Sequence, residues 1–86
     1  MGNFIGGSAY AMSRDISEGY ILLNAALLKK FSSTELLQLR HELDKVRKEV
    51  RSEQTPPNDV QAIQKRARKI SRINSAFLIL DTLRKR

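Results

Sequence analysis

The chain has 86 residues, of which 41% are hydrophobic and 29% are charged, a profile typical of a small soluble helical protein and not of a disordered tail. Its length allows one small domain, or a subunit that completes its core by pairing with another chain. The formal net charge is +7, and cysteine is absent, which excludes disulfides and zinc sites built on thiolates.

Residues 1–14 are predicted to form a flexible arm, because three of the four glycines lie there among small residues. A first helix is predicted over residues 15–31, with Ser13 or Asp15 as the side chain that caps its first turn. Gly19 lies within this range and weakens the first turns by up to about 1 kcal/mol.

The longest nearly apolar run, residues 20–28, has nine residues and is interrupted by Asn24. A transmembrane helix needs about 20 apolar residues. No small-x-small cleavage site follows the run before Lys29, so a cleaved secretory signal is not expected. We therefore predict a cytoplasmic protein without a transmembrane segment.

A second helix is predicted over residues 33–52. Ser32 and Glu35 have the spacing of a capping box, in which each side chain accepts a hydrogen bond from the backbone amide of the other residue. Apolar residues at steps of three and four then make one continuous helical face: Leu36, Leu39, Leu43, Val46 and Val50. The helix is expected to end before Pro56 and Pro57, because proline has no amide donor.

A third helix is predicted over residues 59–84, with Asn58 or Asp59 as its cap. Its own apolar face keeps the same steps: Val60, Ile63, Ala67, Ile70, Asn74 and Phe77. Because the connection is short, helices 33–52 and 59–84 are expected to form an antiparallel hairpin with their apolar faces together. The predicted fold is thus all-α with three helices, the hairpin and an additional N-terminal helix, in a single domain over residues 15–86.

Asn74 occupies a position that apolar residues hold elsewhere on this face. A buried asparagine can set the register of a helix pair. The alternative, which we favour, is that the apolar face drifts toward Ile73 and leaves Asn74 at the edge of the contact.

The end of the third helix changes character, since apolar residues surround it on nearly every side from residue 73 to residue 83. A helix that is apolar all round is buried, and helix 33–52 cannot cover it alone. Helix 15–31 is the natural additional cover, from the same chain or from a partner chain. These segments supply the predicted partner interface: Tyr20, Ile21, Leu23, Leu27, Leu28, Ile73, Leu78, Ile79 and Leu83.

Basic residues are concentrated in the last third of the chain. Residues 59–86 hold eight basic and two acidic residues, and hence six of the seven net positive charges. Lys65 and Lys69, like Arg68 and Arg72, repel each other at four-residue spacing unless an anion relieves them. The predicted contacts to nucleic acid or another anion are Lys65, Arg66, Arg68, Lys69, Arg72, Arg84, Lys85 and Arg86. The alternative is a solvated face whose terminal cations complement the helix dipole.

His41 is the only histidine, and a metal site needs several ligands. It lies between Arg40 and Glu42 and is expected to be solvated. Without cysteine, and with a single exposed histidine, the chain has no constellation for nucleophilic or general-base catalysis. We predict no enzymatic activity, no metal ion and no cofactor.

Four short runs in the predicted hairpin are similar to those of a known family: Thr34-Glu35-Leu36-Leu37, Leu39-Arg40, Val46-Arg47 and, after the turn, Arg68-Lys69-Ile70-Ser71-Arg72-Ile73. With them the chain resembles the family of the twenty-ninth protein of the large ribosomal subunit, a two-helix hairpin whose second helix carries a similar basic run. The resemblance implies contact with ribosomal RNA through Arg68, Lys69 and Arg72, near the peptide exit tunnel. The chain departs from the family by its N-terminal helix and by Pro56-Pro57.

Two functional hypotheses follow. The first is a structural or adaptor subunit whose apolar N-terminal helix and C-terminal end bind a protein partner, either a partner helix or another copy in a homo-oligomer. The second is a basic accessory protein that binds RNA or another polyanion through residues 65–72. The adaptor hypothesis is placed first, because its apolar evidence spans two segments.

Overall fold

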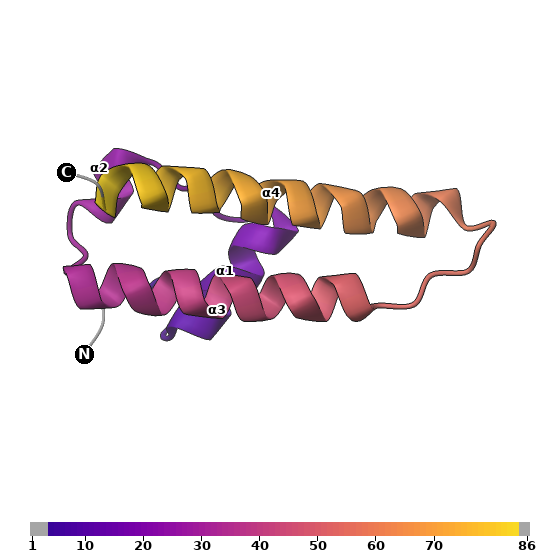
Figure 1. Ribbon diagram of the computed structural model, residues 1–86, viewed down its shortest axis with the longest axis horizontal. Coiled ribbons are helices and arrows are strands. Elements are labelled where there is room, and N and C mark those ends of the chain that lie inside the picture. Colours follow the sequence, from indigo (N-terminus) through magenta and orange to yellow (C-terminus); the bar gives the residue numbers. More distant parts are fainter. Residues whose placement is uncertain (1–3, 85–86) are drawn as a thin grey trace.

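A computed structural model of the chain describes residues 4–84, for Arg84 the backbone alone. Within this range the structure has four α-helices and no strand (Figure 1). They are α1 (Ala9–Glu18), α2 (Ala25–Leu28), α3 (Ser33–Ser52) and α4 (Val60–Arg84). The predicted all-α class is confirmed, but four helices replace the predicted three.

The start of α3 shows the predicted capping box. The Glu35 amide donates to Ser32 Oγ at 3.2 Å, and the Ser32 amide donates to Glu35 Oε1 at 3.0 Å. At the other end, Glu53 already has extended backbone angles, ahead of the two prolines. Because both signals are local, the predicted bounds of this helix are confirmed.

The start of α4 is capped by Asp59, whose Oδ1 accepts a hydrogen bond from the Ala62 amide at 3.0 Å. α3 and α4 lie side by side and run in opposite directions (Figure 1). Arg66 Nη1 donates to the carbonyl oxygen of Glu53 at 2.9 Å, so the end of α3 lies beside the second turn of α4. The first turns of α4 therefore extend past α3, and Val60 and Ile63 are exposed instead of facing it as predicted.

The prediction for the first helix was wrong. Residues 9–14, predicted as part of a flexible arm, are helical, and Ser8 caps α1 by accepting a hydrogen bond from the Ala11 amide at 3.1 Å. α1 ends after Glu18, because Gly19 adopts a left-handed conformation with φ 87°. The amides of Gly19 and Tyr20 then donate to carbonyl oxygens of the last turn, which closes the helix in a Schellman motif.

The chain between α1 and α3 is largely not helical. Residues 21–24 have no regular secondary structure, and α2 is a single turn capped by Asn24, whose Oδ1 accepts from the Leu27 amide at 2.8 Å. Three side chains from this connection, those of Leu23, Leu28 and Phe31, are buried. The connection therefore contributes to the core even though it is not the predicted helix.

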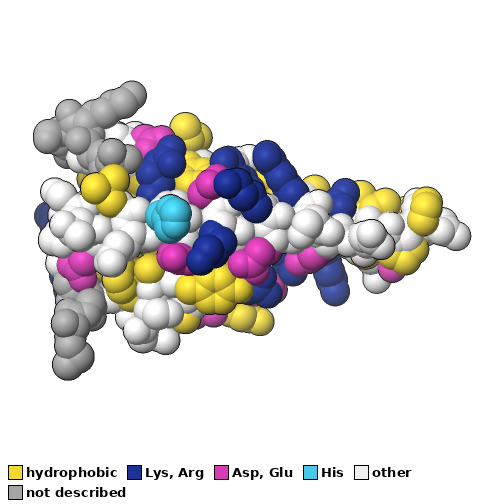
Figure 2. Space-filling view, turned by 60° about the horizontal axis from the view of Figure 1, so that its bottom comes forward, with side chains coloured by type: hydrophobic (Ala, Val, Ile, Leu, Met, Phe, Trp, Pro, Cys, Tyr) yellow, Lys and Arg dark blue, Asp and Glu magenta, His cyan; other side chains and the backbone are white. Residues whose placement is uncertain are grey.

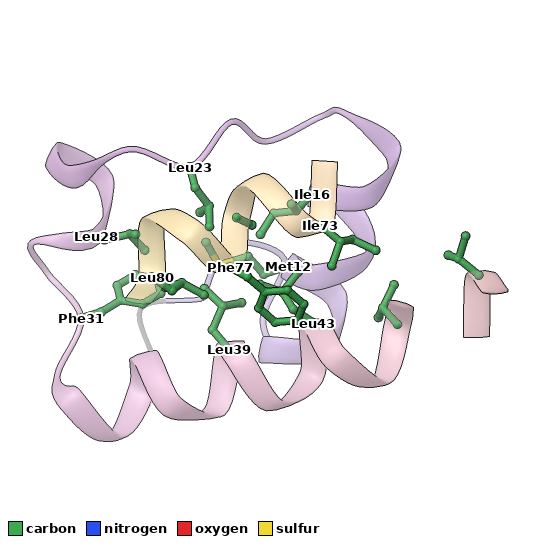
Figure 3. Packing of buried hydrophobic residues seen from close by; sticks show 13 residues of the cluster. Met12, Ile16, Leu23, Leu28, Phe31, Leu39, Leu43, Ile73, Phe77 and Leu80 are labelled. Carbon is green, nitrogen blue, oxygen red and sulfur yellow. The ribbon is translucent and has the colours of Figure 1, made fainter. Parts of the chain in front are cut away.

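One hydrophobic core unites all these elements. α1 crosses the α3–α4 pair obliquely and packs against both helices (Figure 1). Figure 3 shows Met12 of α1 with Leu43 of α3 and Phe77 of α4 at the centre, and Leu28 and Phe31 near Leu80. The inner side of the apolar C-terminal half of α4, with Ile73 and Leu80, is therefore covered by α1 and by residues 20–31 of the same chain, whereas Leu78 on its outer side is exposed.

α1 approaches its neighbours through small side chains. Ser13 and Ser17 are fully buried, and each hydroxyl donates to a backbone carbonyl of its own helix, that of Ala9 at 2.8 Å and that of Arg14 at 2.7 Å. These hydrogen bonds satisfy the buried hydroxyls. Ser13, predicted as a cap, is thus a core residue.

The ring of Phe77 is covered by two guanidinium groups of α3. Arg40 Cζ lies 4.8 Å and Arg47 Cζ 4.5 Å from its centroid, within the range of cation–π contact. Arg40 also donates two hydrogen bonds to Asp81, at 2.8 and 3.2 Å, which raise the pKa of the guanidinium. Arg47 Nη1 donates to Asn74 Oδ1 at 3.1 Å, and Asn74 is exposed, which confirms the favoured interpretation that it lies at the edge of the contact.

Tyr10 links α1 to α3 on the outside of the molecule. Its hydroxyl donates to Glu49 Oε2 at 2.9 Å, and this carboxylate also lies 3.8 Å from Arg14 Nη1. The hydrogen bond is the largest cause that raises the pKa of Tyr10 above its ordinary value of 10.0. A donor whose folded-state pKa is raised contributes stability below its unfolded pKa, and this contribution is lost as the pH rises through the folded pKa.

We therefore expect a small, pH-dependent loss of stability above about pH 10. In a Tyr20→Phe background Tyr10 is the only tyrosine, and its ultraviolet absorbance at alkaline pH reports its ionisation. Glu49→Gln should move this titration toward lower pH. A titration that is the same in both proteins would contradict the role assigned to Glu49.

Candidate functional site

An apolar depression of about 220 Å³ lies between the chain after α1 and the outer side of α4. On the α4 side its lining includes small residues, Ser71, Ser75 and Ala76, and on the other side the main lining residues are Ile21, Leu22 and Leu23. In this non-helical segment Leu23 lies in the core and Leu22 is exposed. The depression therefore exists because α1 stops at Gly19 and the chain continues without helix.

A second apolar depression of about 410 Å³ continues the first one along α4. The two share Leu23 and Ile79, and the second is further lined by Asn24, Ala25, Leu78, Thr82 and Leu83. We call the two together the apolar groove. Large hydrophobic side chains stand exposed on it or beside it: Tyr20 at 78%, Leu22 at 85% and Leu78 at 71%.

The structure brings together only some of the residues predicted as a partner interface. Ile21, Leu23, Leu78, Ile79 and Leu83 line the apolar groove, and the exposed Tyr20 directly precedes the lining segment.

Leu28 and Ile73, predicted as part of a partner interface, are instead buried in the core of the chain, and Leu27 packs partly against the same core. Leu23 is also almost fully buried, so it forms part of the wall of the apolar groove without being exposed on its edge. The prediction missed Leu22, because a helix through residue 22 does not produce the non-helical backbone that exposes this side chain. Gly19, followed by the four large hydrophobic residues 20–23, was the signal that could have indicated it.

Much of the predicted basic face holds α1 in place. Arg72 Nη1 donates to the carbonyl oxygen of Ser17 at 3.0 Å, in the last turn of α1. Lys69 Nζ lies 3.2 Å from a carboxylate oxygen of Glu18 and 3.9 Å from one of Glu53. Cations at the C-terminal end of a helix interact favourably with its dipole. For Lys69 the chain itself thus supplies the anions that relieve the repulsion on α4, whereas Arg72 is held by a neutral carbonyl group.

Lys65 and Arg68 remain exposed. With Lys69 and Arg72 they line a depression of about 350 Å³ in which Glu18 is the one carboxylate residue. We call these four the cationic cluster. It adjoins the apolar groove, because Arg72 lines both. Of the remaining predicted contacts, Arg66 binds the Glu53 carbonyl, and the side chain of Arg84 together with Lys85 and Arg86 lies outside the described residues.

The α3 side of the molecule has a different character. Figure 2 shows basic and acidic side chains interleaved over this side, with hydrophobic ones scattered among them. Asp44, for example, lies 2.9 Å from Arg47 and 3.3 Å from Lys48, and hydrogen bonds from these cations lower the pKa of its carboxyl group. His41 is exposed. This side therefore pairs many of its charges locally.

Among residues 4–84, no group of three or more histidine, aspartate or glutamate side chains could hold a metal ion. None of the helices in the same range is long and apolar enough to cross a membrane.

Comparisons with protein-family models, with curated proteins and with solved structures found no match for this chain. The resemblance to the family of the twenty-ninth large-subunit ribosomal protein therefore stays a prediction. The apolar groove and the cationic cluster are the surfaces from which a function can be proposed.

Proposed function

We propose that the protein is a non-enzymatic helical interaction module, a small adaptor subunit that binds a helix of a partner protein, or of another copy, in the apolar groove. The observation that carries this proposal is the exposure of Leu22 and Leu78, at 85% and 71%, on the edges of a concave apolar surface. Contiguous exposed apolar surface on a small protein marks an interaction site. A groove beside a helix suits the apolar face of an amphipathic helix.

Other exposed hydrophobic side chains lie in more polar surroundings or at the end of the molecule. Leu37 lines a separate depression of about 530 Å³ whose lining also includes polar and charged residues, among them Gln38 and Glu42. Val60 and Ile63 lie where α4 extends past α3. The apolar groove, in contrast, combines small floor residues with large rim residues. The small serines give an incoming helix room to approach, and the leucines can then cover its sides.

Binding of RNA or another polyanion is the second candidate, and the exposed Lys65 and Arg68 support it. It is placed second because Arg66, Lys69 and Arg72 already have partners within the chain. Affinity for bulk RNA that falls steeply with salt, while an apolar peptide does not bind, would favour this function.

The test of the adaptor function is the binding of a neutral amphipathic helical peptide of about 18 residues, or five turns. Its leucines are spaced by three and four, glutamines fill the other face, and a fluorophore reports binding by anisotropy. Leu78→Asp should weaken binding at least about tenfold, roughly 1.4 kcal/mol, because it places a charge where the partner buries apolar surface.

Leu37→Asp is the matched control, because Leu37 is also an exposed leucine on a long helix but lies outside the groove. It should leave binding unchanged, and thermal unfolding monitored by circular dichroism shows that both variants fold. Sedimentation equilibrium of the full chain tests in parallel whether another copy of the chain supplies the bound helix. A chain that stays monomeric and binds no peptide, or equal losses in both variants, would rule the function out.

A further inference from the structure

The outer side of α4 carries a stripe of residues at steps of three and four whose chemistry changes along its length. It begins with Lys65, Arg68 and Arg72, passes through Ser71 and Ser75, and ends with Leu78, Ile79 and Thr82. From Lys65 to Thr82 it spans about 26 Å, at roughly 1.5 Å per residue. The apolar groove lies along its second half and the cationic cluster along its first half.

The two halves differ sharply in charge. Among the side chains that the structure describes, those of residues 4–83, Arg72 is the one charged residue that lines the apolar groove, and the stripe includes no carboxylate. Within residues 4–84 neither Lys65 nor Arg68 has an ion-pair partner, whereas Lys69 is paired with Glu18. Exposed unpaired cations at one end of a groove attract a ligand that brings negative charge to that end.

A second copy of this chain is a poor occupant on these grounds. Two α4 stripes laid parallel would place cation against cation. Laid antiparallel, they would place the cations of each copy over the apolar half of the other, with no carboxylate on either stripe. Each chain also carries a formal net charge of +7, which opposes association.

We infer that the occupant of the apolar groove is an acidic amphipathic helix of a partner protein. Its apolar residues lie in the groove against Leu22, Leu78 and Ile79, and its carboxylates lie over Lys65 and Arg68. This inference rests on the proposed function and adds to it the chemistry and the order of the partner residues.

A protein helix fits this surface better than a membrane or a nucleic acid. The groove is hollowed between two segments of the chain, so the apolar side chains of a helix can enter it. A phosphate backbone could pair with the cations, but it offers no apolar groups for the second, apolar half of the stripe. Both alternatives are included in the test.

The test compares three fluorescent helical peptides of equal length that share leucines over one half. The other half carries glutamates, glutamines or lysines. The full-length protein should bind the glutamate peptide at least about tenfold more tightly than the glutamine peptide, and the lysine peptide most weakly. The preference should shrink as salt is added, because exposed charges are screened.

The variant Lys65→Glu with Arg68→Glu should abolish the preference for glutamate while it keeps the affinity for the glutamine peptide. Its matched control is Lys45→Glu with Arg51→Glu, which changes the net charge equally at exposed positions of α3. The control should retain most of the preference. Binding of anionic phospholipid vesicles and of bulk RNA is measured for four proteins: the unchanged chain, the two double variants and Leu78→Asp.

The inference is supported if selectivity among the peptides depends on Lys65 and Arg68 and affinity for all of them depends on Leu78. It is overturned, with the proposed function intact, if the three peptides bind equally well. It is also overturned if vesicles or RNA bind more tightly than the glutamate peptide with the same dependence on Lys65 and Arg68. If no peptide binds, the proposed function fails as well.

Discussion

Replacing Leu43 by alanine is expected to lower the free energy of unfolding by about 2–5 kcal/mol, the range for a large-to-small change in a packed core. Leu43 is fully buried at the centre of the core, where it meets Met12 of α1 and Phe77 of α4 (Figure 3). The loss combines the transfer energy of the removed methyl groups with the cavity left behind. Three helices meet here, so the site can collapse little.

The measurement is urea unfolding followed by circular dichroism, with the transition midpoint compared at constant slope. Leu37→Ala is the control, because Leu37 is 48% exposed on the same helix. It should change stability by less than about 0.5 kcal/mol. Similar losses for both substitutions would show that α3 does not bury the face assigned to it.

Replacing Gly19 by alanine is expected to cost about 2–3 kcal/mol for two reasons. Its φ of 87° places a Cβ close to the following carbonyl, which costs about 1–2 kcal/mol. That Cβ would also lie 3.0 Å from Arg72 Cζ. The guanidinium must shift by a few tenths of an ångström, which weakens its hydrogen bond to the Ser17 carbonyl.

Gly7 separates these two causes. Its φ is 94°, and a Cβ there would meet nothing within 4 Å, so Gly7→Ala should show the backbone cost alone. In an Arg72→Ala background, Gly19→Ala should likewise cost only this amount. Thermal and urea unfolding of the unchanged chain, Gly19→Ala, Arg72→Ala and the double variant measure the coupling energy between residues 19 and 72. A full loss from Gly19→Ala without Arg72 would contradict the proposed contact.

Gly19 also connects the fold to the proposed function. By ending α1 it allows residues 20–24 to run without helix along α4, where Leu22 and Leu23 form one wall of the apolar groove. Gly19→Ala is therefore expected to disturb peptide binding together with stability. Leu78→Asp should affect binding with little loss of stability, which distinguishes the two effects.

The helices whose ends carry local signals could be predicted from sequence. The capping box of Ser32 and Glu35, the prolines after α3 and the cap at Asp59 each act within four residues, so the sequence alone indicates them. The first helix could not be predicted in the same way. The apolar run after Gly19 favoured continuation, whereas the left-handed glycine and the packing of Leu23, Leu28 and Phe31 against α3 and α4 favoured termination.

The candidate site likewise has features that the sequence determines and features that depend on tertiary contacts. The sequence by itself determined that α4 is basic in its first half and apolar in its second half, because these properties follow from residue type and helical period. Only the tertiary structure decided which of those side chains remain available. Lys69 and the exposed Arg72 are held by the C-terminal end of α1, and Ile73 is buried. Lys65 and Arg68 have no ion-pair partner among residues 4–84, and Leu78 is exposed. The reason is that contacts between α1 and α4 join residues about fifty positions apart, and no local pattern records such a pairing.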